Sequence, residues 1–200
     1  FRLRLREPLV TAVGRHASRE GVLVTLEAHR GLEGWGEAMP LPGFGTETLH
    51  ETRETLLALA PRLVGEALTD LDAILDGLEL AAAVAPAARA AVDVALHDLV
   101  ARASGRTLSG WLAGRFGRPP RARVPVNALL SEQEPRLVAE AARRAVAEGF
   151  RTLKLKVAAG GLEGDVVRLA AIRAAVGPRP RLRLDANGGW KEEEALAALS

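Results

Sequence analysis

The spacing of hydrophobic residues changes partway along the chain, and this change divides it into two predicted domains. In the first part, the run FRLRL alternates apolar and polar residues, VLVTLEAH is rich in residues that favour strands, and the glycines of GLEGWGEA mark a turn between strands. This pattern predicts short strands over residues 1–40. We expect them to form one small antiparallel sheet.

Helical patterns follow this predicted sheet. Thr48 and Glu51 form a capping-box pattern ahead of the apolar run TLLALAPRL. The side chain of Thr69 or Asp70 is expected to cap the segment DLDAILDGLEL. A third helix is predicted to begin at Pro86, because proline is favoured in the first turn of a helix. Sheet and helices together predict an α+β domain.

Strand-like and helical patterns alternate after the glycine-, proline- and arginine-rich stretch GRFGRPPR. Three apolar runs, VPVNALL, TLKLKV and RLRLDAN, are separated by helical patterns at 136–148 and 162–176, each followed by a glycine. This β-α-β-α-β order is typical of parallel strands joined by helices. We therefore predict two domains, residues 1–118 and residues 119–200.

Polar side chains are expected to gather on one face of these parallel strands. Asn127, Lys156 and Asp185 are equally spaced along the chain, at an interval typical of one strand-helix unit, which predicts equivalent positions. Because side chains alternate along a strand, the other residues of each strand can be assigned to this polar face or to the opposite, apolar face. The polar face is predicted to hold Asn127, Lys154, Lys156, Arg183, Asp185 and Asn187, and the apolar face Val126, Leu155, Leu182 and Leu184.

A barrel fits this two-faced pattern better than an open sheet does. Strands of an open doubly wound sheet are apolar on both faces, because helices cover both. In a (β/α)₈ barrel, catalytic groups lie at the carboxyl ends of the strands. Eight strand-helix units need about 250 residues, so three units predict an incomplete barrel. Phe1 in place of methionine, and the absence of a stop signal before Ser200, likewise predict a fragment.

Composition limits the classes of partner. The 27 basic and 25 acidic residues give a formal charge of +2 without a basic block, so no nucleic-acid partner is expected. The longest apolar stretch is too short to span a bilayer, so no membrane partner is expected. The absence of cysteine excludes disulfides and thiolate metal sites and is compatible with the expected cytoplasmic location. The four histidines lack metal-binding spacing and are predicted to be surface or cap residues.

Lysine usage is the strongest chemical signal in the sequence. The chain has three lysines, and two of them, Lys154 and Lys156, lie two residues apart in TLKLKV. Arginine keeps its proton in proteins, whereas burial or nearby charge can make a lysine release its own. In a strand both side chains point the same way, about 7 Å apart. One interpretation is an edge strand with a solvated lysine face. We favour Lys156 as a base and Lys154 as the group that tunes it.

A carboxylate is predicted to end the next strand. Asp185 is followed two residues later by Asn187 and then by two glycines. A carboxylate at such a position can cap a helix or a turn. It can also bind a hard cation such as Mg²⁺, which prefers oxygen ligands. Beside two lysines that point the same way, we favour the metal ligand.

These motifs resemble a known family. LKLKV, followed one strand-helix unit later by LRLDANGGW, resembles the enolase superfamily in its muconate-lactonizing subgroup. GWGEAMPLPGFGTETLHET resembles the capping domain of the o-succinylbenzoate synthases of that superfamily, in which a PLPGF loop reaches over the barrel mouth. The resemblance covers all 200 residues. It implies an α+β capping domain and then the first part of an enolase-like, TIM-type (β/α) barrel, truncated after the third strand.

The resemblance implies a role for each residue of the motifs. Lys156 resembles the base that removes the proton α to a carboxylate and later assists loss of hydroxide, and Lys154 resembles its partner. Asp185 resembles the first of three ligands to Mg²⁺, with Mn²⁺ as the alternative ion, and the metal stabilises an enediolate. The family's other metal ligands and its second lysine come from later strands.

Substrate contacts are implied from two sources. Val13–Arg19 and Leu41–Gly45 resemble mobile capping loops that close over the substrate, as lids do. The implied substrate-binding residues are His16, Arg19 and Phe44 from these loops, with Asn127 and Asn187 from the strands.

The expected function is a magnesium-dependent dehydratase acting on a small-molecule carboxylate. The resemblance implies formation of 2-succinylbenzoate in menaquinone biosynthesis. One alternative is a dipeptide epimerase or N-acylamino acid racemase of the same superfamily. A lysine that attacks a carbonyl, as in a Schiff-base aldolase, is another. An inactive truncated fragment is a third.

Overall fold

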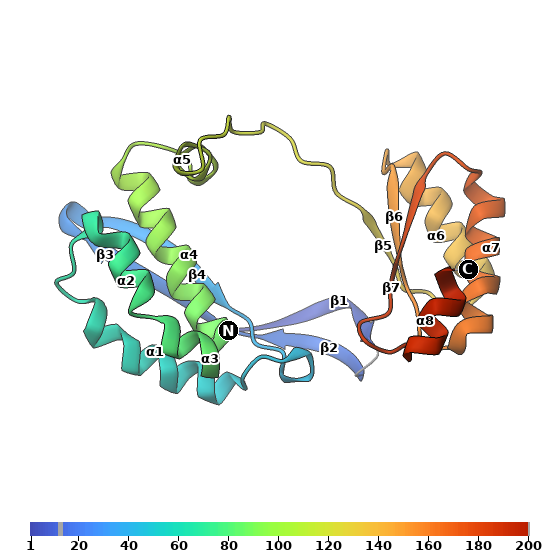
Figure 1. Ribbon diagram of the computed structural model, residues 1–200, viewed down its shortest axis with the longest axis horizontal. Coiled ribbons are helices and arrows are strands. Elements are labelled where there is room, and N and C mark those ends of the chain that lie inside the picture. Colours follow the sequence, from blue (N-terminus) through green and yellow to red (C-terminus); the bar gives the residue numbers. More distant parts are fainter. Residues whose placement is uncertain (12–13, 200) are drawn as a thin grey trace. The chain divides into compact units, whose positions relative to one another are not determined.

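The computed structural model describes residues 1–11 and 14–199 (Figure 1). The strands are β1 (Arg2–Thr11), β2 (Gly14–Glu20), β3 (Val22–Ala28), β4 (Leu32–Ala38), β5 (Ala128–Leu130), β6 (Thr152–Lys156) and β7 (Arg181–Asp185). The α-helices are α1 (Leu49–Leu63), α2 (Leu71–Asp76), α3 (Glu79–Val84), α4 (Pro86–Ala103), α5 (Leu108–Arg115), α6 (Pro135–Ala147), α7 (Gly161–Val176) and α8 (Glu192–Leu199). Short 3₁₀ helices are η1 (His29–Gly31), η2 (Pro42–Phe44) and η3 (Leu68–Asp70).

The chain forms two compact units. The first consists of Phe1–Leu5 with Ser18–Ala122, and the second of Arg6–Ala17 with Arg123–Ser200. No helix among the described residues combines the length and the apolar character needed to cross a membrane.

The strands before residue 40 form two hairpins instead of the single sheet predicted. β1 pairs with β2, and β3 pairs separately with β4. The register of the second hairpin runs from Val22 opposite Ala38 to Ala28 opposite Leu32. Its turn is closed by η1, where Arg30 and Gly31 both have positive φ, at 69° and 70°.

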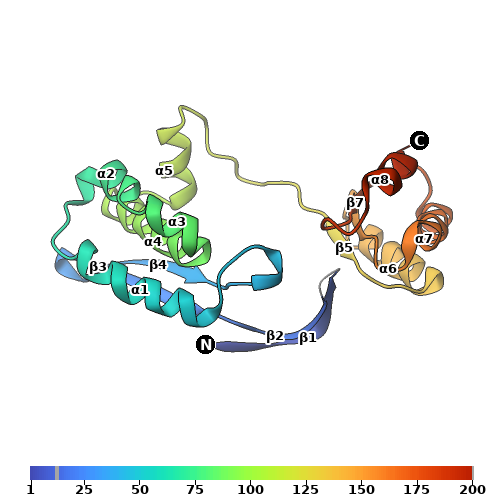
Figure 2. The same ribbon diagram turned by 60° about the horizontal axis from the view of Figure 1, so that its bottom comes forward.

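Helix α4 packs directly on strand β4, as Figures 1 and 2 show. The contact is between backbones: a Cβ placed on Gly36 would lie 1.9 Å from the carbonyl oxygen of Ala91, and one on Gly34 would lie 2.2 Å from that of Ala95. Ala91 and Ala95 are fully buried. Glycine in the strand and alanine in the helix therefore allow an approach that larger side chains would prevent.

The helix starts in the first unit are formed in different ways. The capping box at Thr48 and Glu51 is confirmed. Asp70 precedes α2 but makes no side-chain cap bond, and Thr69 donates to Asp70 itself, so the predicted cap is wrong. The reason is that η3 runs directly into α2, so that Asp70 does not adopt the extended backbone that a capping side chain needs.

The second unit contains a three-stranded parallel sheet in the order β5-β6-β7, with α6 and α7 on one side of it (Figures 1 and 2). Leu153 and Leu155 of β6 are buried against this helical layer, together with Val138 of α6 and Ile172 of α7. Lys154 and Lys156, at the alternate positions of β6, are only partly buried. The predicted two-faced strand is therefore confirmed for β6.

The strands on either side of β6 depart from the prediction. β5 is only Ala128–Leu130, and Val126, predicted to lie on the packed face, is 69% exposed in the segment before it. Leu184 of β7 is 37% exposed, although Leu182 contacts the core. Within the described residues β7 is an edge strand, so its apolar positions are less covered than those of β6.

The register of the sheet differs between its two strand pairs. Lys156 lies opposite Asp185, so the predicted spacing is confirmed for β6 and β7. Leu129 lies opposite Lys154, so the offset along the chain between β5 and β6 is shorter than that between β6 and β7. The difference arises mainly because α6 has 13 residues and α7 has 16. The predicted equivalence of Asn127 with Lys156 and Asp185 is therefore wrong.

Candidate active site

Two lysines and one aspartate meet at the carboxyl ends of β6 and β7. The Nζ atoms of Lys154 and Lys156 each lie 2.7 Å from Oδ2 of Asp185. Lys156 also donates a hydrogen bond to the side-chain oxygen of Asn187. The alternation of β6 puts both ammonium groups on one face, and the parallel register brings Asp185 beside Lys156.

The charges of this cluster are partly shielded from water. The exposed fractions of the side chains are 29% for Lys154, 16% for Lys156 and 18% for Asp185. Hydrogen bonds from Lys154 and then Lys156 lower the pKa of Asp185 to about 2, because they stabilise its ionised form. Two ammonium groups against one carboxylate leave a net positive charge, which favours a nearby anion.

The turn after β7 holds Asn187 against this cluster. Asn187 has a positive φ of 47°, and its backbone N–H donates to Oδ1 of Asp185 at 3.1 Å. Asparagine tolerates this left-handed conformation better than most residues do. The turn directs the side chain of Asn187 back to Lys156, as the hydrogen bond between them shows.

Asn127 lies at the other end of the sheet from this cluster. Continued by one residue, the register of β5 places Asn127 opposite Thr152, at the start of β6. That position is four residues before Lys156, or roughly 13 Å along a strand. Its side chain donates to the carbonyl of Ala128. Asn127 remains a prediction as a substrate-binding residue, but the structure does not bring it to the lysines.

Ser131 is the residue that the register places opposite Lys156 on the β5 side. Continued by one residue past β5, the pairing that joins Leu130 to Leu155 joins Ser131 to Lys156. Ser131 is partly buried, and it carries a hydroxyl that can donate or accept a hydrogen bond. Equal spacing of the three strands would place Asn127 at this position, so the sequence pattern alone does not point to Ser131.

The residues predicted from the capping loops have varied surroundings. Arg19 donates to the backbone carbonyls of Met39, at 2.7 Å, and Pro40, at 3.3 Å, so it anchors the start of the PLPGF loop. Phe44, at the end of η2, is 37% exposed. The Nε2 atom of His16 is buried and has no hydrogen-bond partner among the described residues. Val13, the first residue of the predicted loop, lies outside the described residues.

A magnesium site would draw on Asp185. Its lowered pKa keeps it ionised near neutral pH, and a carboxylate oxygen is a ligand that Mg²⁺ prefers. In the part of the chain that the structure describes, no group of three or more His, Cys, Asp or Glu side chains could hold a metal ion. Asp185 therefore fits as one ligand of a site that needs further oxygen ligands.

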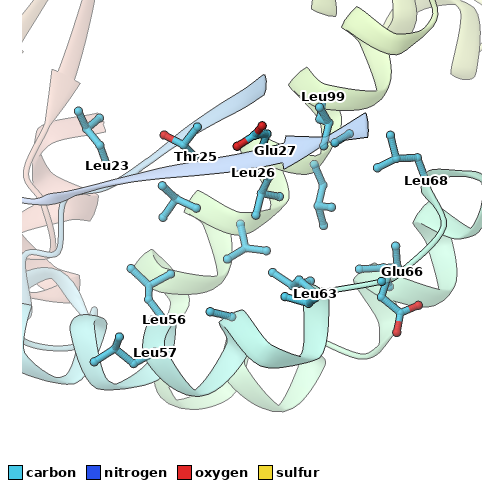
Figure 3. A pocket seen from close by; sticks show the side chains of 18 of the residues that line it. Leu23, Thr25, Leu26, Glu27, Leu56, Leu57, Leu63, Glu66, Leu68 and Leu99 are labelled. Carbon is cyan, nitrogen blue, oxygen red and sulfur yellow. The ribbon is translucent and has the colours of Figure 1, made fainter. Parts of the chain in front are cut away.

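A large cavity lies elsewhere, in the first unit. It has a volume of about 1000 Å³ and lies between β3, α1 and α4 (Figure 3). Most of its lining is leucine and valine, including Leu26, Leu56 and Leu99. None of the residues predicted for the site lines it.

Comparison with known protein families identifies both parts of the chain. Residues 2–112 match the mandelate racemase / muconate lactonizing enzyme N-terminal domain. The chain belongs to the mandelate racemase / muconate lactonizing enzyme family. Residues 136–200 match the enolase C-terminal domain-like family, so this part of the family member is the start of a barrel domain. The resemblance to the enolase superfamily is confirmed.

Several enzymes of this family are similar to the chain. It is 34% identical over 198 residues to a hydrophobic dipeptide epimerase of Enterococcus faecalis, covering 99% of this chain and 54% of that protein. It is 33% identical over 192 residues to an o-succinylbenzoate synthase of Thermosynechococcus vestitus, covering 96% of this chain and 51% of that protein. The chain thus spans about half the length of the curated relatives it matches.

Solved structures give the same picture. The crystal structure of the dipeptide epimerase from Enterococcus faecalis, complexed with Mg and the dipeptide L-Leu-L-Tyr, has a TM-score of 0.91 at 34% identity. It is covered to 55% by this chain, and all of this chain is covered. Epimerases and a synthase match at similar identity, so the expected preference for dehydration is not specifically supported.

Proposed function

We propose that the protein carrying this chain removes the proton α to a carboxylate of a small substrate, and that it epimerises a dipeptide or racemises an N-acylated amino acid. The observation that carries the proposal is the convergence of Lys154, Lys156 and Asp185 on adjacent strands, with both Nζ atoms 2.7 Å from one carboxylate oxygen. The similarity to a dipeptide epimerase over 99% of the chain supports the choice of substrate class.

Lys156 is the proposed base. As a neutral amine, its Nζ accepts the proton, the Cα–H bond breaks, and the electron pair moves towards the substrate carboxylate. A proton then returns to the opposite face of the carbon, from a second acid group, to give the inverted product. Lys156 is the less exposed of the two lysines, at 16% against 29% for Lys154.

The neighbours of Lys156 have supporting roles in this proposal. Lys154 keeps a positive charge beside the reaction centre, which attracts the substrate carboxylate. Asn187 accepts a hydrogen bond from Lys156 and so orients its Nζ. Asp185 is the proposed ligand from this chain to Mg²⁺, which when bound would neutralise negative charge on the substrate carboxylate.

A dehydration that forms 2-succinylbenzoate is the second candidate. It begins with the same proton abstraction, but hydroxide then leaves and no proton returns. The PLPGF segment, together with 33% identity to an o-succinylbenzoate synthase, favours this candidate. Lys156 would be the base in either reaction.

The test follows exchange of the α-proton in D₂O. The full-length protein with Mg²⁺ is incubated with a panel of hydrophobic and charged dipeptides. ¹H NMR measures loss of the α-proton signal, and chiral chromatography measures inversion. We expect exchange and inversion at one residue of a preferred dipeptide. Formation of 2-succinylbenzoate, with no exchange into any dipeptide, would favour the synthase.

Lys156→Arg tests the assigned base. Arginine keeps a cation beside Asp185 but cannot release its proton, so exchange should slow by about 10² to 10⁴-fold. Lys191→Arg is the matched control, because Lys191 is exposed and its hydrogen bond to Glu194 uses only the backbone N–H. Equal rates in both variants would contradict the assignment. Borohydride trapping of a lysine adduct would instead support a Schiff base.

A further inference from the structure

A buried ion pair on α7 contacts the segments that carry the candidate site. Asp165 and Arg168 lie three residues apart, and their side chains are 1% and 2% exposed. Burial of two charges is unfavourable unless each is paired and its remaining hydrogen-bonding groups are satisfied. The partners that satisfy them therefore show what the pair holds in place.

Arg168 binds the backbone of two strand ends. One guanidinium nitrogen, Nη2, donates to Oδ1 of Asp165. The other, Nη1, donates to the carbonyl of Lys156 at 3.0 Å and to that of Glu132 at 3.2 Å. Glu132 follows Ser131, the residue that the register places opposite Lys156. A single side chain thus links α7 to the last residue of β6 and to the loop after β5.

Asp165 holds the chain just beyond Lys156. Its second oxygen, Oδ2, accepts a hydrogen bond from the backbone N–H of Ala158 at 2.8 Å. Ala158 has a φ of 75°, in the left-handed region that residues other than glycine, asparagine and aspartate seldom adopt. The hydrogen bond stabilises this unfavourable turn, so the backbone is fixed on both sides of Val157.

The same oxygen of Asp165 also reaches the loop after β7. The indole Nε1–H of Trp190 donates to Oδ2 of Asp165 at 3.3 Å. Trp190 comes three residues after Asn187 and packs against the apolar core of the second unit. The loop that follows β7 is thus held at Trp190 by the same carboxylate that binds the N–H of Ala158.

We propose that Asp165 and Arg168 are positioning residues for the proton transfer. They fix the position of the Lys156 backbone and of the loop that carries Asn187. In this way they hold Nζ of Lys156 beside Asp185 and within reach of the substrate carbon. Neither residue touches the reacting atoms. This inference deepens the proposed function and rests on it.

Arg173 provides a matched control for a purely structural role. It lies on the same helix, and its guanidinium also donates to two backbone carbonyls, those of Gly177 at 3.0 Å and Pro180 at 2.9 Å. These carbonyls lie in the loop before β7, at the amino end of that strand and not at its carboxyl end. Arg168→Lys and Arg173→Lys therefore each remove a guanidinium that donates to two backbone carbonyls, one near the candidate site and one away from it.

The kinetic test compares the two variants in the full-length protein. Lysine cannot reproduce the planar set of bonds that arginine makes, so Arg168→Lys should displace Lys156. A displacement of about 1 Å can lower a rate by about 100-fold, and we expect kcat to fall by that order while KM stays nearly unchanged. Arg173→Lys should retain kcat. An equal fall in both variants, or a retained kcat in Arg168→Lys, would overturn the proposal.

An NMR measurement tests the inference without activity. The chain has three tryptophans, and Trp190→Phe identifies the indole N–H resonance of Trp190. Asp165→Asn should shift that resonance and accelerate hydrogen exchange at the amide of Ala158, whereas Arg173→Lys should change neither. If the unaltered protein exchanges no α-proton, the proposed function fails, yet these spectra still decide whether the pair holds both loops.

Trp190→Phe provides a second test of the link between Asp165 and the loop after β7, and it can be used if Asp165→Asn does not fold. Phenylalanine keeps an aromatic ring in the core and removes only the indole donor to Asp165. We expect a fall in kcat smaller than that of Arg168→Lys, and unchanged protection of the Ala158 amide. A kcat equal to that of the unaltered protein would show that the loop after β7 does not depend on Asp165.

Discussion

Each of the two compact units contains a buried carboxylate that accepts hydrogen bonds from the backbone, and the two carboxylates stabilise different parts of the structure. Glu47, in the first unit, is 6% exposed and accepts hydrogen bonds from the N–H groups of Ala87 and Ala88 and from the hydroxyl of Thr52. It fixes the start of α4. Asp165, in the second unit, holds a loop beside the lysines. The same chemistry secures packing in one unit and the candidate site in the other.

Strands β4 and β6 differ in the same way, because one is used for packing and the other carries the candidate site. Strand β4 is covered so closely by α4 that Gly34 and Gly36 leave no room for a side chain. Strand β6 packs on its helices through Leu153 and Leu155, and its other face presents Lys154 and Lys156. The first unit should therefore respond to substitutions mainly through stability, and the second through charge and activity.

Gly36→Ala should have the largest effect on stability. The new methyl group would lie 1.9 Å from the carbonyl oxygen of Ala91, so α4 would have to move away from β4. We expect a loss of about 3 kcal/mol or more in the free energy of unfolding, measured by urea denaturation. Gly164→Ala in α7 is the control, since no atom lies near its Cβ position. It should stabilise the protein by roughly 0.5 to 1 kcal/mol. Similar losses in both variants would contradict the close packing described for β4.

Glu47→Ala should destabilise the first unit by a smaller amount. It leaves the buried N–H of Ala88 without its acceptor, which costs about 1 to 3 kcal/mol. Glu51→Ala, which removes an exposed capping-box carboxylate, should have a smaller effect still, because water can replace the lost partner. Thermal unfolding of both variants measures the difference. A larger loss for Glu51→Ala would show that Glu47 does not fix α4.

Lys154→Met should change the acid titration of the second unit. Lys154 is the largest cause of the lowered pKa of Asp185, so its removal should raise that pKa from about 2 towards the ordinary 3.8. Because the folded-state pKa is the lower one, this carboxylate stabilises the fold above pH 3.8, and the contribution is lost as the pH falls towards 2. ¹³C NMR of the Asp185 carboxyl measures the shift. Arg183→Met, on the same face of the sheet, is the control and should leave the titration nearly unchanged.

Substitution of His97 should have the smallest effect, on the pH dependence of stability near pH 6.5. Burial, with the nearby charges of Arg115 and Arg89, lowers the pKa of this histidine below 6.5. The unfolded chain therefore takes up the proton first, and stability should fall as the pH drops below 6.5. His97→Phe keeps a ring beside Trp111, which His97 meets edge to face at 5.3 Å, and should flatten this part of the stability profile. An unchanged profile would show that His97 does not contribute.

Most of the candidate site was predictable because it depends on local alternation and on one strand-helix repeat. Lys154 and Lys156 share a face in any strand, and the repeat spacing correctly placed Asp185 beside Lys156. The same spacing misplaced Asn127, because the length of a helix between strands is not fixed by the strands themselves. Helix α6 is three residues shorter than α7, and the chain offset between paired residues is correspondingly shorter for β5 and β6 than for β6 and β7.

The buried ion pair was missed although the sequence contains a signal for it. Asp165, Arg168 and Ile172 lie at positions i, i+3 and i+7, so they share one face of α7, and all three are buried. Charged residues on the apolar face of a helix indicate a paired, hydrogen-bonded role. The partners of the pair could not be predicted, because they are backbone groups of loops that are distant in sequence. His97 was also predicted wrongly, as a surface or cap residue: its side chain is only 16% exposed and contacts Trp111.

The scarcity of lysine has a practical consequence for chemical labelling. Arginine does not react with amine-directed acylating reagents under mild conditions, so the side-chain amines of this chain are Lys154, Lys156 and Lys191. The first two share one oxygen of Asp185, whereas Lys191 is exposed. Mass spectrometry of peptides gives the ratio of acylation at the paired amines to that at Lys191. This ratio reports whether Asp185 still pairs with Lys154 and Lys156 or binds another group instead.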